Sequence, residues 1–172
     1  MPAESPQIHR SAFIAPGAVV VGAVTIGEEA SIWYQCVLRG DINRIQVGAR
    51  SNIQDGTVIH IADDYPAIVG NDVSVGHRAI IHACEIGDET LVGMGAILMD
   101  GAVIGPRCVI AAGAIVTKGF HAPEGSLIMG TPAKIVRELT AKEREANVAL
   151  AAKYVEVARR FRGMPEAEIR PK

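Results

Sequence analysis

The chain has 172 residues, which is enough for one domain with a continuous apolar core. Hydrophobic residues make up 49% of it but aromatic residues only 4%, and together with 18 glycines this favours many short β-strands over a helical bundle. A net charge of -2 gives no electrostatic basis for binding nucleic acid or an anionic membrane, and no apolar run approaches the roughly 18 residues of a membrane span.

The N-terminal residues and the cysteines favour a cytoplasmic location. Residues 1–14 lack a basic stretch followed by an apolar one, so no secretory signal is predicted. Cys36, Cys84 and Cys108 form no CxxC pair, and an odd number of scattered thiols is typical of a reducing compartment. We interpret these cysteines as small buried hydrophobic residues.

From residue 14 onward an aliphatic residue recurs every six positions, with two interruptions and one step of five. These positions are Ile14, Val20, Ile26, Ile32, Leu38, Val47, Ile53, Ile59, Val69, Val75, Ile81, Ile86, Val92, Leu98, Ile104, Ile110 and Val116. Glycine or alanine often follows the aliphatic residue, and a small residue such as Ala30 or Cys108 lies four positions after it. Neither a helical period nor simple alternation gives this pattern.

The six-residue period predicts a triangular coil with three short sides and about eighteen residues per turn. Each aliphatic side chain would point inward and stack on its counterpart one coil away, at a strand spacing of roughly 4.8 Å. Glycine would permit the tight backbone at the corners. The pattern resembles the hexapeptide repeat of left-handed parallel β-helix proteins, and this resemblance implies the left hand, an exception to the usual crossover rule. We therefore expect one mainly β domain over 1–172, with the β-helix at about 8–130.

Two breaks in the repeat predict loops. From Leu38 to Val47 the step is nine residues, so about three residues near Ile42 to Ile45 are extra. From Ile59 to Val69 the step is ten, so four residues are inserted around 61–67. Loops on a rigid solenoid commonly carry function.

The C-terminal part, about 132–163, changes to a helical pattern. Thr131 and Pro132 are predicted to close the solenoid, and the T-A-K-E sequence at 140–143 is typical of a capping box. An apolar stripe at helical spacing follows, and Gly163 and Pro165 are expected to end the helix. The stripe consists of Leu150, Tyr154, Val157 and Phe161, widened by Val148, Ala151 and Val155. We expect this helix to pack along a prism, its own or a neighbour's.

Three of the five histidines fall in register for a shared metal. His60 and His82 each follow the core aliphatic residue of their hexads, and their separation of 22 residues equals three hexads plus the four inserted residues. They are therefore predicted to lie side by side on adjacent coils, whereas His77 would point outward from a different side of the triangle. His9 and His121, near the ends of the repeat, are expected to be structural.

A metal bound by three histidines needs each ring nitrogen within about 2.1 Å. The register therefore predicts that His77 comes from another subunit, which gives a homotrimer with metal sites between subunits. Three neutral imidazoles leave a position for water, whose pKa such a site can lower to about 7. Zn²⁺ is the expected ion, and Fe²⁺ or Co²⁺ also suits three histidines.

Five motifs are similar to those of the γ-class carbonic anhydrases, and the resemblance covers essentially the whole chain. They are V-L-R-G-D at 37–41, N-I-Q-D-G at 52–56, V-I-H at 58–60, V-G-H at 75–77 and I-H-A-C at 81–84. The resemblance implies a lyase that reversibly hydrates carbon dioxide to bicarbonate by metal-bound hydroxide. It also implies that His60, His77 and His82 are the zinc ligands, with His77 donated across the subunit interface.

The same resemblance implies roles for the polar residues around the metal. Arg39 matches an arginine that pairs, between subunits and near bicarbonate, with the aspartate matched by Asp55. Gln54 matches a residue that orients the hydroxide, Asp41 matches another active-site residue, and Asn52 matches a polar residue on the carbon dioxide side. A purely adhesive role at the interface is an alternative for Arg39 and Asp55.

The chain departs from the fully characterised archetype of the family in its acidic residues. Ile42 stands where the archetype has a glutamate, and the second loop offers only Asp63 and Asp64 in place of a proton-shuttling glutamate. A missing shuttle would slow the reaction. The chain resembles a shorter subclass, in which Tyr154 matches a tyrosine near the metal; packing on the prism is the alternative for this residue.

Two other functions are weighed against this enzyme. A hexapeptide acyltransferase using acyl-CoA is suggested by the M-G-T-P-A-K segment at 129–134. A catalytically silent or assembly member of the same family would keep the trimer and its metal without useful turnover. The three histidines in register, together with Arg39, Gln54 and Asp55, favour the metalloenzyme.

Overall fold

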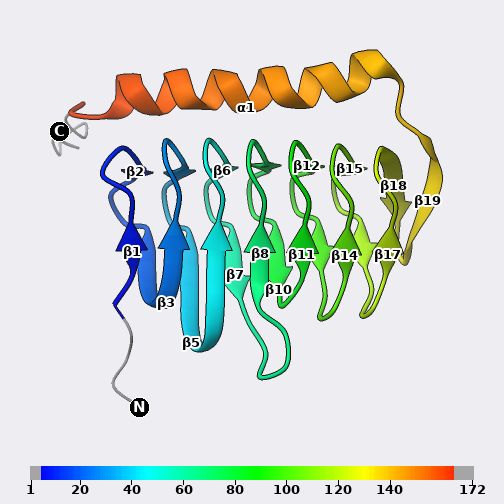
Figure 1. The fold of residues 1–172 in the computed structure, drawn as a ribbon, viewed down its shortest axis with the longest axis horizontal. Coiled ribbons are helices and arrows are strands. Elements are labelled where there is room, and N and C mark those ends of the chain that lie inside the picture. Colours follow the sequence, from blue (N-terminus) through cyan, green and yellow to red (C-terminus); the bar gives the residue numbers. More distant parts are fainter. Residues whose placement is uncertain (1–4, 165–172) are drawn as a thin grey trace, which may run out of the picture.

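The computed structural model describes residues 5–164 and is a three-sided parallel β-helix with one long α-helix along its side (Figure 1). Each strand pairs in parallel with strands of the neighbouring coils, apart from an antiparallel pair at the C-terminal end. The prediction of a left-handed β-helix of hexapeptide repeats with a C-terminal helix is confirmed. No helix within residues 5–164 is long and apolar enough to cross a membrane.

The first face of the prism contains the strands that end in His60 and His82. It is formed by the N-terminal halves of β3 (Val19–Ile26) and β5 (Val37–Val47), then β7 (Val58–His60), β10 (Ile80–His82), β13 (Ile97–Leu98) and β16 (Ile115–Val116). Its outward residues stand in one register from Val19 through Val58 to Ile115.

The second face continues the first around a corner, because β3 and β5 run through that corner as single long strands. It is formed by β1 (Gln7–Ile8), the C-terminal halves of β3 and β5, β8 (Ala67–Val69), β11 (Glu85–Ile86), β14 (Val103–Ile104) and β17 (His121–Ala122).

The third face is a separate sheet and lies under the helix. Its strands are β2 (Phe13–Ile14), β4 (Ser31–Ile32), β6 (Asn52–Ile53), β9 (Ser74–Val75), β12 (Leu91–Val92), β15 (Val109–Ile110), β18 (Ser126–Gly130) and β19 (Ala133–Glu138).

The inside of the prism is filled by the repeated aliphatic residues, as the period predicts. Ile53, Ile59 and Ile81 are completely buried, and burial of one such side chain stabilises the fold by roughly 1.5–3 kcal/mol. The three cysteines are free and buried, as expected. Burial raises the pKa of the Cys84 thiol to about 12, which makes it unreactive at neutral pH.

The glycines that follow core aliphatic residues are required by close approach of the next coil rather than by a corner conformation. A Cβ on Gly48 would lie 2.4 Å from the carbonyl oxygen of Gly70, and one on Gly76 would lie 2.7 Å from the amide of Met94. Neither glycine has a positive φ, whereas non-glycine turn residues such as Arg50 do, at 57°. The prediction that these glycines permit a tight backbone at the corners is therefore replaced by a different reason: they leave room for the backbone of the next coil.

The first break lies at the corner between the first and second faces. The strand register passes from Gly22 opposite Gly40 to Val24 opposite Ile45, so the extra residues fall within 41–44. The prediction that Ile45 belongs to the insertion is wrong, because Ile45 is 1% exposed and fills the inward position next to Val24.

The second insertion projects beside the first at the lower edge of the molecule (Figure 1). Ile61 and Ala67 are buried, so residues 62–66 form the exposed loop. The side-chain amide of Asn43 donates hydrogen bonds of 3.1 Å to the carbonyl oxygens of Ala62 and Asp63. The two insertions therefore support one another at the corner that follows His60.

The C-terminal segment is not helical throughout. Residues Ala133–Glu138 form β19, which pairs antiparallel with β18, and the helix α1 spans Ala141–Phe161. The predicted helical segment of about 132–163 therefore begins with a strand, which covers the edge of β18, and the helix itself starts at the predicted capping box. The capping box is confirmed, since Thr140 and Glu143 exchange the expected bonds. Gly163 follows the helix with φ of 88°, and Pro165 lies outside the described residues.

The buried face of α1 is smaller and more polar than the predicted stripe. It consists of Asn147, Ala151, Val155 and Ala158, and it packs against β4, β6 and β9. The side-chain amide of Asn147 donates to the carbonyl oxygens of Glu89 and Cys108 at 3.2 and 3.1 Å. Tyr154 and Phe161 instead flank this face and contact the indole of Trp33, with centroid distances of 5.8 and 5.4 Å.

Candidate metal centre

His60 and His82 stand directly opposite one another at the ends of β7 and β10, as the repeat predicts. Nδ1 of His60 lies 3.2 Å from Nε2 of His82. Two nitrogens bound to one tetrahedral zinc ion at about 2.05 Å are separated by about 3.3 Å. The spacing of the pair therefore fits two ligands of a single metal ion.

The other nitrogen of each ring faces a carboxylate. Nε2 of His60 lies 3.1 Å from Oδ1 of Asp41, and Nδ1 of His82 lies 2.5 Å from Oδ1 of Asp100. Arg39 pairs with Asp41. A carboxylate accepts a ring N–H, so the two ring nitrogens that face each other both carry lone pairs when the rings are neutral. Such lone pairs repel unless a cation lies between them, and carboxylate-bound imidazoles are typical of metal ligands.

The pKa values of these carboxyl groups agree with this hydrogen bonding. For Asp41, desolvation is the largest influence and acts to raise the pKa, but the combined bonds from His60, the backbone and Arg39 lower it. For Asp100, the hydrogen bond from His82 is the main cause of a lowered pKa. Both groups are therefore acceptors at neutral pH.

His77 lies on a different edge of the prism, in the turn between β9 and β10. Its Nδ1 is 2.8 Å from Oδ2 of Asp55, which leaves Nε2 without a partner from the described residues. Its side chain is 43% exposed. Within residues 5–164, no three His, Cys, Asp or Glu side chains of one chain are grouped to hold a metal ion.

Apart from Arg39 and Asp41, the other candidate residues lie at or beside the His77 edge, which we define as the turns between the third and first faces that contain Tyr34, Asp55 and His77. Nε2 of Gln54 donates to Oδ1 of Asn52 at 3.0 Å, and the amide of Asn52 donates to Oγ of Ser74 at 2.8 Å. Both amide side chains are buried.

Tyr154 reaches the same edge from α1. Its ring meets Trp33 edge-on, and its hydroxyl pKa is raised first by burial and then by the charge of Asp55. The contact with Trp33, next to Tyr34, is what places Tyr154 beside the His77 edge, so the alternative of packing on the prism also describes its position.

The structure does not bring Arg39 and Asp55 together in one chain. Arg39 lies with Asp41, His60 and His82 on the opposite corner, which we call the His60 edge, whereas Asp55 pairs with His77. Both side chains are nearly half exposed, so each can meet a second subunit.

Sequence reasoning missed two features of this region. Asp100 follows His82 by 18 residues, one full coil, and that spacing was the available signal. The outward side of the first face is aliphatic, because each of its strands has an aliphatic residue directly before the core residue, as in Val58-Ile59 and Ile80-Ile81. Its exposed or half-buried members are Val19, Val37, Val58, Ile80, Ile97 and Ile115.

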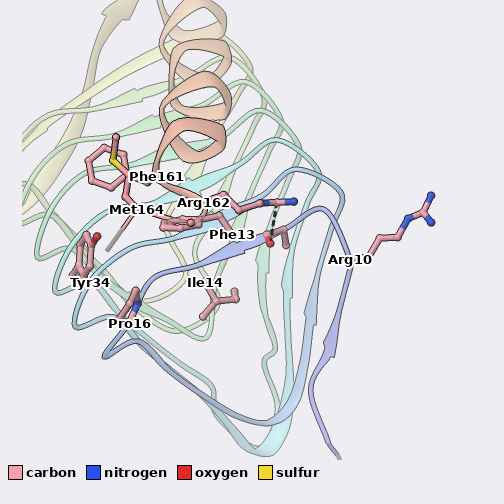
Figure 2. A pocket seen from close by; sticks show the side chains of 10 residues that line it. Arg10, Phe13, Ile14, Pro16, Tyr34, Phe161, Arg162 and Met164 are labelled. Carbon is pink, nitrogen blue, oxygen red and sulfur yellow. Dashed lines mark hydrogen bonds between the residues drawn. The ribbon is translucent and has the colours of Figure 1, made fainter. Parts of the chain in front are cut away.

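A cavity of about 850 Å³ lies at the N-terminal end of the prism, where α1 ends. Figure 2 shows Phe13, Tyr34 and Phe161 around it and Arg10 pointing away. Arg162 is bound to the carbonyl oxygens of Ser11 and Ala12. None of the three candidate metal ligands lines this cavity, so it does not belong to the metal centre.

These features define a protein of the hexapeptide-repeat β-helix class with candidate metal-ligand histidines on two edges of one face. Residues 5–40 and 83–118 match the bacterial transferase hexapeptide family of six repeats, and residues 66–99 match the hexapeptide repeat of succinyl-transferase. A Methanocaldococcus jannaschii protein named "Probable carbonic anhydrase" is 47% identical over 151 residues, covering 88% of this chain and 95% of that protein. The chain belongs to the gamma carbonic anhydrase family.

Two further relatives illustrate the range of this similarity. Mitochondrial gamma carbonic anhydrase 2 of Arabidopsis thaliana is 43% identical over 161 residues, covering 90% of this chain. The chain spans 58% of the length of that plant protein. A solved Bacillus cereus structure, described as a candidate acetyltransferase, is 41% identical with a TM-score of 0.92 and 95% coverage of both chains.

Proposed function

We propose that this protein is a metal-dependent carbonic anhydrase that reversibly hydrates carbon dioxide to bicarbonate at sites shared between the subunits of a homotrimer. The observation that carries the proposal is the His60–His82 pair. Its inner nitrogens lie 3.2 Å apart, and its outer nitrogens are held by Asp41 and Asp100. The names of the relatives agree with this reaction.

The trimer follows from the position of the two half-sites. The pair His60 and His82 lies on one edge of the first face, and His77 lies on the other. Between them runs the exposed aliphatic surface, including Val58 at 38% and Ile80 at 40% exposure. An interface in which the His77 edge of one chain meets the His60 edge of the next is heterologous, and three such contacts close into a ring. This assembly buries the aliphatic surface and completes each ligand set.

His60, His82 and His77 of a neighbouring subunit would hold the ion, and Zn²⁺ suits three imidazoles. Such an ion would lower the pKa of a bound water molecule to about 7 and so would supply hydroxide at neutral pH. Because Nε2 of Gln54 donates to Asn52, its Oε1 is left to accept a hydrogen bond from the attacking hydroxyl group. Gln54 would in this way orient the attacking oxygen toward carbon dioxide.

Three further residues complete the proposed site. Arg39 supplies a cation for bicarbonate and, with the partner subunit's Asp55, a bridge across the interface. Asn52 fixes the orientation of Gln54, and Tyr154 closes the His77 side. We place the protein in the cytoplasm, because its three free, buried thiols suit a reducing compartment.

Proton release is expected to limit turnover. The loop beside the His60 edge offers only the exposed carboxylates of Asp63 and Asp64 to accept a proton. In the other insertion the exposed residue Ile42 stands where a carboxylate could transfer the proton to solvent. Raising the imidazole buffer concentration should therefore increase the maximal hydration rate by a factor on the order of ten. Stopped-flow measurements at constant pH and ionic strength test this, and a rate independent of buffer would contradict it.

The direct test of function is stopped-flow hydration of carbon dioxide by protein purified under reducing conditions with its metal content measured. We expect a rate above the buffer that scales with bound metal and disappears on chelation. A fully metal-loaded trimer without hydration activity would support a silent or assembly protein instead. The description of the Bacillus cereus neighbour makes acyl transfer the second candidate, and turnover of acetyl-CoA by the metal-free protein would favour it.

A further inference from the structure

We propose that Asp100 is a positioning residue of the metal centre, which selects the tautomer of His82 that can bind metal. This inference rests on the proposed metal site and adds a residue outside the motifs that mark the family resemblance. Oδ1 of Asp100 lies 2.5 Å from Nδ1 of His82, and the two side chains are 30% and 36% exposed. The pair therefore keeps a direct hydrogen bond in a partly shielded position.

The backbone around Asp100 is fixed by neighbouring coils on both sides. The amide of Gly101 donates to the carbonyl of Ala83 at 2.8 Å, and the amide of Gly119 donates to the carbonyl of Asp100 at 2.9 Å. The ring of Tyr65, from the second insertion, lies against Gly101, since a Cβ there would be 3.2 Å from Cε1. The carboxylate is therefore held in place before any metal arrives.

The tautomer matters because His82 has two competing acceptors. A neutral imidazole carries one N–H, and Asp100 draws it to Nδ1, which leaves the Nε2 lone pair facing Nδ1 of His60 at 3.2 Å. In the opposite tautomer Nε2–H would donate to His60, and this hydrogen bond would occupy both nitrogens that the metal needs. Asp100 therefore determines whether His60 and His82 present two lone pairs to a metal ion or form a hydrogen bond with each other.

Asp100→Ala should weaken zinc binding about 10- to 100-fold, the range observed for partners that orient metal ligands. Zinc affinity is measured on the whole trimer by competition with a chelator. The matched control is Asp72→Ala, which also removes a carboxylate that bridges coils, by its pair with Arg50, but touches no histidine. Asp100→Asn keeps a carbonyl acceptor of similar shape and should recover part of the affinity.

A second readout is the tautomer itself, measured by nitrogen NMR of labelled histidines in the metal-free trimer. Wild-type His82 should carry its proton on Nδ1, and Asp100→Ala should shift it toward Nε2. An affinity of Asp100→Ala within twofold of Asp72→Ala, or an Nε2 proton in the wild type, would overturn the proposal. Neither readout uses carbon dioxide. A protein that binds zinc but does not hydrate carbon dioxide would therefore refute the proposed reaction, and the two readouts would still test the role of Asp100.

Discussion

His77→Ala should reduce bound metal from about one ion per chain to background and lower carbon dioxide hydration at least a hundredfold. The reason is that His60 and His82 alone leave two ligands, which hold zinc far less tightly than three. The β-helix should survive, because His77 is a half-exposed turn residue whose side chain pairs with Asp55. Metal analysis of the purified protein and stopped-flow kinetics measure the two losses, and circular dichroism checks the fold.

The matched control for this variant is His121→Ala. His121 is also exposed, and its ring is bound to the carbonyl oxygen of Gly119 rather than to any candidate metal ligand. Its replacement should leave metal content and hydration unchanged. A His77→Ala protein that retained wild-type metal would show that the three-histidine site is wrong.

Val58→Glu should convert the trimer to monomers and remove metal binding although every ligand remains in the chain. Val58 stands in the middle of the aliphatic surface of the first face, and the trimer would bury a carboxylate there in each of three contacts. An unpaired charge buried at an interface is destabilising by several kcal/mol, which is enough to dissociate the ring.

The second face provides the matched control, because Val103→Glu makes the same substitution at a residue of nearly equal exposure, 36% against 38%. The variant should remain a trimer with full metal content. Analytical ultracentrifugation and metal analysis compare the two proteins. If Val58→Glu stayed a trimer, as Val103→Glu is expected to, the first face would be excluded as the interface.

The repeat allowed the fold and the histidine pair to be predicted, for one physical reason. In a solenoid the sequence period is also the spacing between neighbours in space, so residues one coil apart must lie side by side. The separation of His60 and His82 followed from this rule once the insertion was counted. Asp100 obeys the same rule, but an aspartate one coil from a histidine has no sequence motif that marks it as its partner.

The remaining errors arose where the period gives no information. The insertion was placed too far along because counting cannot tell which residue returns to the core, and Ile45 does so by size. The helix face was misjudged because Asn147 looks polar in the sequence, although it is buried to satisfy two carbonyl groups of the third face. How chains meet depends on outward residues, which the core pattern does not describe.

The central claim is that each metal ion is held by histidines of two chains, and mixed trimers test it most directly. Chains carrying His77→Ala and chains carrying His60→Ala, with different tags, are co-assembled one to one, and mixed trimers are verified by tandem purification. A shared site is intact when one partner supplies the pair and the other supplies His77, so each mixed trimer should hold one intact site, which is about a third of the wild-type metal content. If verified mixed trimers recovered no metal, the account would be contradicted, because a chain without His77 and a chain without His60 would then be unable to complete a site together.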